Sequence, residues 1–254
     1  MSSKGRAAAG YKPDPTGFFA TPEYSTRAVL PKLGIKPGMR ILESGCGKGA
    51  IARVLREEFG KDLHITGVEI DKKRAALARK AKAKWVRVTD EAEFEEESLV
   101  FDAVITGDFL KLTPPSDFEK FDLDLSNPWF VIFQKVAEQS FRFCKRTCLL
   151  LPVGSLASKG RFDWWEKYPA HMRILDKRPS FAKSVKCSTG KDNCSYQVLV
   201  ATDESHEKIC PLCGESTTMT SSDSNEYGFF EWGPEITEGK WSGLRTPSPK
   251  KAEP

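Results

Sequence analysis

The residues most able to carry chemistry in this chain of 254 residues stand where predicted strands end. The first are the glycines of the stretch ESGCGKG, which lies between a predicted strand (MRILES) and a predicted helix (AIARVLREEF). Gly45, Gly47 and Gly49 permit a backbone with positive φ and the close approach of a ligand. The free N–H groups at the start of the following helix favour polar or anionic groups. By itself this spacing does not identify the ligand.

Acidic residues at the next two strand ends narrow the choice of ligand. Glu69 ends the predicted strand HITGVEID, where its carboxylate can accept hydrogen bonds from ribose hydroxyls. Asp108 stands beside Phe109 at the end of the next strand, and an acceptor next to an aromatic ring suits an adenine. Each of these residues alone would also fit a turn acid or a core phenylalanine. Because strand ends form the ligand edge of a parallel sheet, the three together predict an adenosine-type cofactor.

A fourth strand end carries the unusual stretch LSNPWF, residues 125–130. It places an amide, a proline and two aromatic side chains where a turn would favour glycine or aspartate. A folding core would bury such aromatic side chains on a regular element. We therefore expect this strand end to take part in chemistry.

These four strand ends resemble motifs I to IV of the class I S-adenosylmethionine-dependent methyltransferases, in the forms ILESGCGKG, GVEID, GDFL and FDLDLSNPWF. More narrowly, they are similar to the methyltransferases that act on adenine N6, whose fourth motif reads Asn/Asp-Pro-Pro-aromatic. The resemblance covers residues 17–202, and residues 151–202 resemble the C-terminal half of small phage and bacterial DNA adenine methyltransferases. Two positions depart from the family: Trp129 replaces a proline, and Ser44 stands where proline or alanine is more usual.

The resemblance implies S-adenosylmethionine as the cofactor. The segment GFFATPEYSTRAVL is similar to the part of adenine methyltransferases that holds the methionine end of this cofactor. The cofactor-binding residues expected in this way are Phe19, Thr21, Glu43, Gly45, Gly47, Gly49, Glu69, Ile70, Asp108, Phe109 and Asn127.

For the target base, the resemblance implies catalytic roles for Asn127, Pro128, Trp129 and Phe130. The side-chain oxygen of Asn127 and the backbone carbonyl of Pro128 would accept hydrogen bonds from the adenine amine and make its nitrogen more nucleophilic. Proline suits this role because its fixed φ holds the carbonyl in one direction. Phe130 would stack on a base that has been extruded from the helix, and Trp129 would add bulk beside it.

The function expected from this resemblance is methylation of adenine N6 in DNA. RNA stays open as the substrate, because too few residues follow the last predicted strand to form a large target-recognition domain. A protein glutamine methyltransferase would share the fourth motif, since an amide nitrogen is also planar. An inert cofactor-binding subunit is the remaining alternative. The cytosine C5 type of chemistry would require a Pro-Cys pair at this strand end, where the chain has Pro-Trp.

The elements that position these residues alternate between strands and helices. This order predicts a Rossmann-like α/β fold, with a mostly parallel seven-stranded sheet and helices on both faces. We expect its last strand at CSYQVLVATD. The predicted organisation is a flexible N-terminus (1–16), a catalytic domain (17–202), an extension (203–243) and a disordered tail (244–254).

Charged and aromatic segments add further expectations. Residues 71–87 are rich in lysine and arginine, and residues 89–98 are rich in acid. This pattern predicts a solvated helix followed by an acidic loop, or a basic face that contacts phosphates. The aromatic-rich residues 226–241 predict a strap that packs back on the domain or a partner-binding segment.

Two segments after the fifth predicted strand offer contacts for nucleic acid. Arg161 and Trp164 belong to one of them, and Lys177 and Arg178 belong to the other. A basic side chain beside an aromatic one is a common means of binding a phosphate and a base together. The alternative for the tryptophan is packing of a helix on the sheet.

The stretch HEKICPLCGES contains half of a zinc-knuckle pattern. Cys210 and Cys213 have the spacing of two ligands, and His206 could provide a third. Free thiols in a loop are the alternative. Structural zinc therefore stays a hypothesis beside the expected cofactor.

The overall composition limits the class of protein. A net charge of +4 permits a nucleic-acid partner without requiring one. Seven cysteines, an odd number, fit a reducing compartment. The N-terminal stretch lacks the apolar region of a secretory signal, and no apolar run is long enough to span a membrane. We therefore expect a cytoplasmic location, or a nuclear one in a eukaryote; the oligomeric state stays open.

Overall fold

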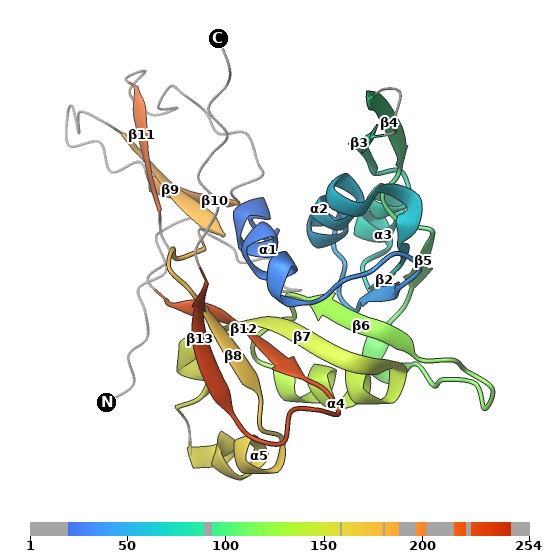
Figure 1. Cartoon of the computed structure of the whole chain (residues 1–254). Coiled ribbons are helices and arrows are strands. Elements are labelled where there is room, and N and C mark those ends of the chain that lie inside the picture. The colour runs from blue at the N-terminus through green and yellow to red at the C-terminus, as the bar shows by residue number, and fades with distance from the viewer. Residues whose placement is uncertain are drawn as a thin grey trace. The chain divides into compact units, whose positions relative to one another are not determined.

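The computed structural model divides the chain into two compact units. The larger comprises Glu23–Lys177 and Asn225–Pro254, and the smaller comprises Met1–Pro22 and Arg178–Ser224. Figure 1 labels their elements. The residues that the structure describes are 20–88, 93–157, 159–179, 181–187, 197–201, 216–221 and 225–244. Among them, every helix is too short or too polar to cross a membrane.

The larger unit is built on an eight-stranded sheet in the order β13-β8-β12-β7-β6-β1-β2-β5. Its strands are β1 (Arg40–Glu43), β2 (His64–Glu69), β5 (Ala103–Thr106), β6 (Phe121–Ser126), β7 (Cys144–Pro152), β8 (His171–Leu175), β12 (Tyr227–Trp232) and β13 (Lys240–Leu244). From β5 to β7 the strands run parallel, whereas β12 runs antiparallel to both of its neighbours. The predicted Rossmann-like fold is confirmed, with eight strands in place of seven.

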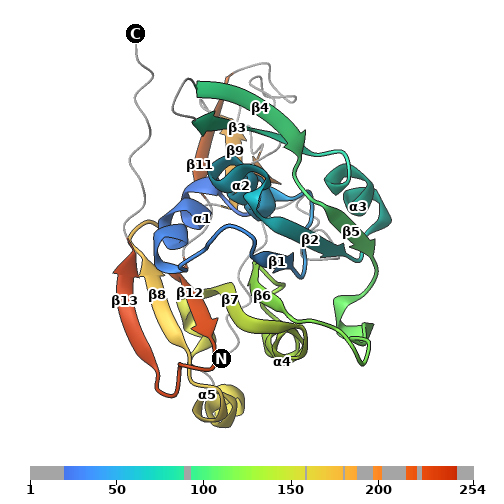
Figure 2. The same ribbon diagram turned by 45° about the vertical axis from the view of Figure 1, so that its right-hand side comes forward.

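Helices cover both faces of this sheet. One face carries α1 (Glu23–Val29), α2 (Ala50–Phe59) and α3 (Lys72–Ala78), and the other carries α4 (Phe133–Phe143) and α5 (Phe162–Lys167), as Figures 1 and 2 show. Helix α2 buries Ile51, Val54 and Leu55, as its apolar spacing predicts. Short 3-10 helices are formed by Leu30–Lys32, Gly60–Asp62, Phe109–Lys111, Val153–Ser155 and Lys159–Arg161.

The central strands contain buried apolar residues because helices cover both faces. In β7, for example, Leu149, Leu150 and Leu151 are completely buried. One core cluster, referred to below as the aromatic cluster, comprises Phe133, Ala137, Leu149, Leu151, Ala170, Phe230 and Trp232. It joins α4 to β7 and β12, and it supports the segments that follow the central strands.

The strand order reverses between β1 and β6. From β1 the chain builds outward through β2 to β5 at one edge, and it then returns to place β6 on the other side of β1. In open parallel sheets, ligands bind outside the carboxyl ends of the strands at such a reversal. The segments that leave β1 and β6 there are the glycine turn and residues 127–130. The topology thus brings the first and fourth predicted motifs to one place.

The predicted basic helix is confirmed over Lys72–Ala78, but the rest of the charged region is a β-hairpin where an acidic loop was expected. β3 (Lys82–Val88) pairs antiparallel with β4 (Glu93–Leu99). Lys84 of β3 lies 2.8 Å from Glu95 of β4 in an exposed ion pair. Trp85 is buried whereas its neighbours along β3 are exposed, which is the alternation of a strand. The lysines of this strand are engaged by the acids of the next one.

The aromatic segment near the C-terminus supplies a central strand of the main sheet. β12 lies between β7 and β8, and all of its residues are buried. The predicted end of the catalytic domain at residue 202 therefore lies before a strand that belongs to the main sheet. Gly228 permits the close pairing, because a Cβ there would lie 2.9 Å from the backbone oxygen of Arg173 in β8. Pairing between segments so far apart in the chain leaves no local signal in the sequence.

A buried ion cluster joins these three neighbouring strands. Glu231 of β12 accepts hydrogen bonds from Arg146 of β7 and from Arg173 of β8. The Nε atom of Arg146 lies 3.0 Å from the carboxylate, and the side chain of Glu231 is only 5% exposed. Because removal of one member would leave the others buried and unbalanced, the cluster favours this strand order.

The smaller unit contains a three-stranded antiparallel sheet in the order β10-β9-β11. Its strands are β9 (Ala182–Cys187), β10 (Gln197–Ala201) and β11 (Thr217–Ser221). The segment predicted as the last strand of the main sheet is thus β10 of this sheet. The predicted zinc ligands Cys210, Cys213 and His206 lie outside the described residues. Within the described ranges, no three acidic, histidine or cysteine side chains gather as a metal site would require.

Candidate active site

The glycine turn after β1 has the backbone that its sequence predicts. Gly47 and Gly49 have φ angles of 54° and 87°, a region that residues with a Cβ rarely adopt. A Cβ at Gly49 would also lie 2.7 Å from the ring of Phe101. At Gly45, in contrast, a Cβ would meet no atom within 4 Å. The space in front of Gly45 is therefore open to a ligand.

Glu43, at the end of β1, holds this turn from beneath. Its side chain is buried, and its carboxylate accepts a hydrogen bond from the backbone N–H of Ala52 at 3.1 Å. Burial raises the pKa of the Glu43 carboxyl well above its usual value, and the carboxylates of Asp124 and Glu69 raise it further. These contacts give Glu43 a positioning role at the start of α2, and direct contact with the cofactor stays a prediction.

Glu69, at the end of β2, contacts both the glycine turn and α3. One carboxylate oxygen accepts a hydrogen bond from the N–H of Gly47 at 2.8 Å. The other accepts from the N–H of Asp71 at 2.8 Å and lies 3.2 Å from the guanidinium of Arg74. A carboxylate has about four acceptor positions, so these donors fill most of them. A ribose hydroxyl would therefore share or replace the contact with Arg74.

The expected adenine-binding residues occupy two different environments. Ile70 is 58% exposed and offers apolar surface next to the end of β2. Asp108 follows β5 and caps a short 3-10 helix with its side chain. Phe109 is 6% exposed and packs on Phe143 of α4, with ring centroids 5.5 Å apart. The phenylalanine thus packs in the core beneath the site, and a contact of its face with an adenine stays a prediction.

A buried hydrogen-bond network joins the glycine turn to the fourth motif. Ser126 Oγ, at the end of β6, accepts a hydrogen bond from the backbone N–H of Ser44 at 2.8 Å and lies 3.1 Å from the Ser44 hydroxyl. Ser126 also donates to Asp124, which is fully buried, and burial raises the pKa of that carboxyl. The role of this network was not predicted. Its signal in the sequence is a pair of polar residues on a strand that is covered on both faces.

Residues 127–130 follow directly on this network. The side-chain oxygen of Asn127 is buried, and Pro128 is buried as well. Phe130 packs against the aromatic cluster and contacts Tyr227 of β12, with ring centroids 5.6 Å apart. Trp129, in contrast, is 46% exposed. The loop is therefore anchored in the core by Phe130, while Trp129 faces solvent.

Helix α4 connects the third motif to the fourth. It begins three residues after Phe130, and its Gln139 side chain donates hydrogen bonds to the carbonyl oxygens of Phe109 and Leu112, at 2.9 and 2.7 Å. In the sheet, Leu42 of β1 lies opposite Asp124 of β6. The ends of β1, β2, β5 and β6 are thus held together by side-chain contacts as well as by strand pairing.

The residues predicted to contact nucleic acid lie on several elements. Trp164 of α5 donates its indole N–H to Glu138 at 2.8 Å, and its ring packs edge-on against Phe133 and Trp232. Arg161 donates to a backbone carbonyl at 2.8 Å. For Trp164 these contacts favour the alternative of helix packing. A direct contact with nucleic acid stays a prediction for both residues.

Two further residues predicted to contact nucleic acid, and two predicted to bind the cofactor, lie near the ends of the larger and smaller units in the sequence. The ammonium of Lys177 lies 4.5 Å from the centre of the Tyr24 ring. Arg178 is exposed and begins the second segment of the smaller unit. Thr21 also belongs to the smaller unit, and Phe19 lies outside the described residues.

Sequence comparisons agree with this architecture. A family model described as a methyltransferase domain matches residues 35–151. A curated tRNA1(Val) (adenine(37)-N6)-methyltransferase from Mannheimia succiniciproducens is 36% identical over 93 residues, which is 36% of this chain and 33% of that protein. The chain thus spans about a third of the length of this curated relative.

Solved structures share the fold. A candidate RNA methyltransferase from Pyrococcus horikoshii superposes with a TM-score of 0.50 at 11% identity, over 86% of this chain and 88% of that one. The methyltransferase subunit of a type I restriction-modification system from Streptococcus thermophilus gives a TM-score of 0.51 at 12% identity, over 89% of this chain and 47% of that one. At these identities the likeness concerns the fold alone.

S-adenosylmethionine is the cofactor of this class of methyltransferase. The described strand ends fit such a molecule, because a Cβ at Gly45 or at Gly107 would project into open space. Glu69 supplies a fixed carboxylate beside the glycine turn, and Ile70 supplies exposed apolar surface. Residues 35–151 therefore match a methyltransferase domain, and the sheet around them has the Rossmann-like fold of methyltransferases.

Proposed function

We propose that this chain transfers the methyl group of S-adenosylmethionine to the N6 amine of an adenine in RNA. One observation carries the proposal: Asn127 and Pro128 leave the carboxyl end of β6 beside the glycine turn, where the strand order reverses. The hydrogen bonds between Ser44 and Ser126 join the two segments. An amide and a proline carbonyl thus stand next to the expected cofactor.

The chemistry of adenine explains why two acceptors are useful. Its exocyclic amine is a poor nucleophile because the nitrogen lone pair is delocalised into the ring. Acceptance of hydrogen bonds from both N–H groups draws the nitrogen towards a tetrahedral form, in which the lone pair is available. Asn127 Oδ1 and the carbonyl of Pro128 are the proposed acceptors, and burial of this oxygen and of Pro128 strengthens such bonds.

The cofactor would be held by the residues at the neighbouring strand ends. When bound, it supplies a methyl group that is activated by a positively charged sulfonium. The backbone of the glycine turn, the carboxylates of Glu69 and Asp108, and the side chain of Ile70 are the proposed contacts. Positioning and fixed dipoles would provide most of the rate enhancement. A strong base is not required, because the alkylated amine loses a proton readily.

RNA comes first among the substrates because the curated relative, at 36% identity over 93 residues, is an adenine-N6 methyltransferase of tRNA. The aligned part is a third of that protein, so its target position is not transferred to this chain. DNA is the second candidate. It is favoured by the resemblance of the fourth motif, and of the region up to residue 202, to DNA adenine methyltransferases.

Parallel methyl-transfer assays test the proposal. The chain would be incubated with tritiated S-adenosylmethionine and with RNA, DNA or a protein extract, and labelled nucleosides would be identified by mass spectrometry. We expect N6-methyladenosine from RNA. Asn127→Ala should lower the rate about 100-fold or more, by analogy with the loss of one hydrogen-bonding group at other transition states.

Controls separate this proposal from its alternatives. Gln134→Ala removes an amide outside the motif and should leave the rate unchanged. Label in nucleic acid that is undiminished by Asn127→Ala would exclude the proposed mechanism. Label in DNA alone would favour the second candidate, and label in glutamine would indicate a protein substrate. An inert subunit would label nothing.

A further inference from the structure

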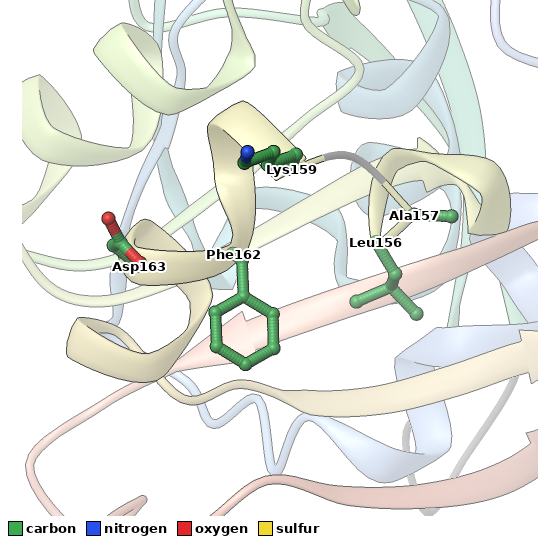
Figure 3. A pocket seen from close by; sticks show the side chains of 5 residues that line it. All are labelled: Leu156, Ala157, Lys159, Phe162 and Asp163. Atoms are coloured by element: carbon green, nitrogen blue, oxygen red, sulfur yellow. The ribbon is translucent and has the colours of Figure 1, made fainter.

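A separate hollow lies in the segment that follows β7. It is lined by Leu156, Ala157, Lys159, Phe162 and Asp163 and has a volume of about 560 Å³, within the size range of small-ligand sites. Figure 3 shows Lys159 and Phe162 in the middle of this group, with Asp163 on one side and Leu156 and Ala157 on the other. None of these residues belongs to the predicted cofactor or amine site.

Phe162 differs from the other aromatic residues of its helix. Its ring is 59% exposed, whereas Trp164 and Trp165 pack against the aromatic cluster. An exposed aromatic side chain at the edge of a hollow offers a flat apolar face to a ligand. Such a face stacks on any nucleobase, because every base has a π-face.

Lys159 and Asp163 add a cation and an acceptor to the same hollow. Within the part of the chain that the structure describes, neither forms an ion pair. The ammonium of Lys159 can neutralise a phosphate, and the carboxylate of Asp163 can accept a hydrogen bond from the amino group of a base. The lining thus combines the three contacts that a nucleotide needs: an aromatic face, a cation and an acceptor.

The hollow lies near the edge of the sheet at which the parallel strands have their carboxyl ends, as the candidate active site does. Because β6 and β7 are parallel neighbours, the segments after their carboxyl ends leave the sheet at one edge. Leu156 and Phe130 also pack against the same aromatic cluster. Arg161 and Trp165 both donate hydrogen bonds to the carbonyl of Ser155, at 2.8 and 3.2 Å, and so fix this segment. The hollow and the fourth motif therefore share one rigid support.

We propose that this hollow binds an unpaired nucleotide next to the target adenine. The ring of Phe162 stacks on the base, Lys159 contacts the phosphate, and Asp163 accepts a hydrogen bond from the base. The inference rests on the proposed function, since it requires a nucleic-acid substrate. It gives the chain a contact outside the adenine site and a source of preference for single-stranded segments.

A binding assay with modified oligonucleotides tests the stacking contact. Fluorescent single-stranded RNA and DNA with one adenine would be compared with strands that carry an abasic site at each position beside the adenine. For the unsubstituted protein, the abasic site at the contacted position should weaken binding by roughly 5- to 100-fold. Phe162→Ala should weaken binding of the intact strand by a similar factor and abolish the effect of the abasic site. Phe162→Trp should retain the binding of the intact strand and the effect of the abasic site.

Matched variants control for general effects. Trp241→Ala removes another exposed aromatic side chain, 74% exposed on β13, and should leave binding unchanged. Lys159→Ala should reduce the slope of log K against log salt concentration by about one, as loss of one phosphate contact does. Lys135→Ala removes an exposed lysine of α4 and should not change the slope.

Three outcomes would overturn the inference. Full sensitivity of Phe162→Ala to the abasic site would exclude stacking on Phe162. If no abasic site changes the binding affinity while adenine is still methylated, this inference is overturned and the proposed function stays intact. A chain that neither binds nor methylates RNA or DNA would overturn both. Agreement between the RNA and DNA series would identify the base, and not the sugar, as the bound group.

Discussion

At the scale of single residues, the candidate site depends on polar side chains that β6 buries. Asp124 and Ser126 are completely buried in β6, where they alternate with the buried residues Leu123 and Leu125. Ser44 is unusual for the family, and its backbone and hydroxyl contacts with Ser126 account for it. A buried polar group is stable only with its hydrogen-bond partners, so each member makes the others necessary. We infer that the network sets the distance between the cofactor turn and the amine acceptors.

Substitution of Ser126 tests this network. Ser126→Ala removes the hydroxyl that donates a hydrogen bond to Asp124 and accepts one from the N–H of Ser44. We expect the free energy of unfolding to fall by about 1–3 kcal/mol, measured by urea denaturation, together with a lower rate of methyl transfer. Ser98→Ala, which removes an exposed hydroxyl of β4, is the matched control. Equal stability of the two variants would show that the network contributes little.

Glu43 predicts a dependence of stability on pH. Its pKa is raised by burial in the folded chain, so the folded state keeps a proton that the unfolded state has released. The stabilisation is complete below the usual pKa of 4.5 and is lost as the pH rises from there towards the folded pKa. Glu43→Gln keeps an acceptor for Ala52 but cannot titrate. In urea denaturation from pH 4.5 upwards, the free energy of unfolding should decline with pH, and this decline should be smaller for Glu43→Gln than for the unsubstituted chain. Parallel curves of this free energy against pH would show that Glu43 is not the cause.

At the scale of elements, the strand–turn–helix units were predictable because each carries its own local signal. Glycines mark the turn before α2, and the apolar spacing of Ile51, Val54 and Leu55 marks the helix. The hairpin β3–β4 was not predicted, because its lysines and glutamates satisfy one another only across strands. Phe109 shows the same limit for the site: an aromatic residue at a strand end can face the ligand or the core, and the sequence does not distinguish the two.

The hairpin gives a prediction that separates packing from charge. Trp85 is 8% exposed and lies against Gly60, so Trp85→Ala should lower the free energy of unfolding by about 3–5 kcal/mol. Lys84→Ala should have no measurable effect, because the ion pair with Glu95 is 64% exposed on both sides. Thermal denaturation of the two variants would test this. A loss from Lys84→Ala as large as that from Trp85→Ala would show that cross-strand charges hold the hairpin.

At the scale of the whole molecule, the main sheet is assembled from two distant parts of the chain. The parallel strands β1, β2, β5, β6 and β7 come first, and β12 and β13 return to the sheet after the smaller unit. The sequence predicted the strands of the first part, because strands and helices alternate there, whereas their order and the reversal between β1 and β6 come from the structure. The sequence assigned the second part to an extension, because β12 pairs with strands far away in the sequence and follows a segment of different composition.

This assembly predicts that the larger unit does not fold without its C-terminal strands. A chain that ends at residue 224 lacks β12, which separates β7 from β8, and leaves Arg146 and Arg173 without Glu231. Because unpaired buried charges and the lost central strand are both costly, we expect no cooperative unfolding transition by circular dichroism and no cofactor binding. A chain that ends at residue 244 retains every strand of the sheet and should unfold like the full chain. Addition of a peptide of residues 225–244 to the shorter chain should restore a cooperative transition. Cooperative unfolding of the shorter chain by itself, at the temperature of the full chain, would show that the sheet is complete without β12.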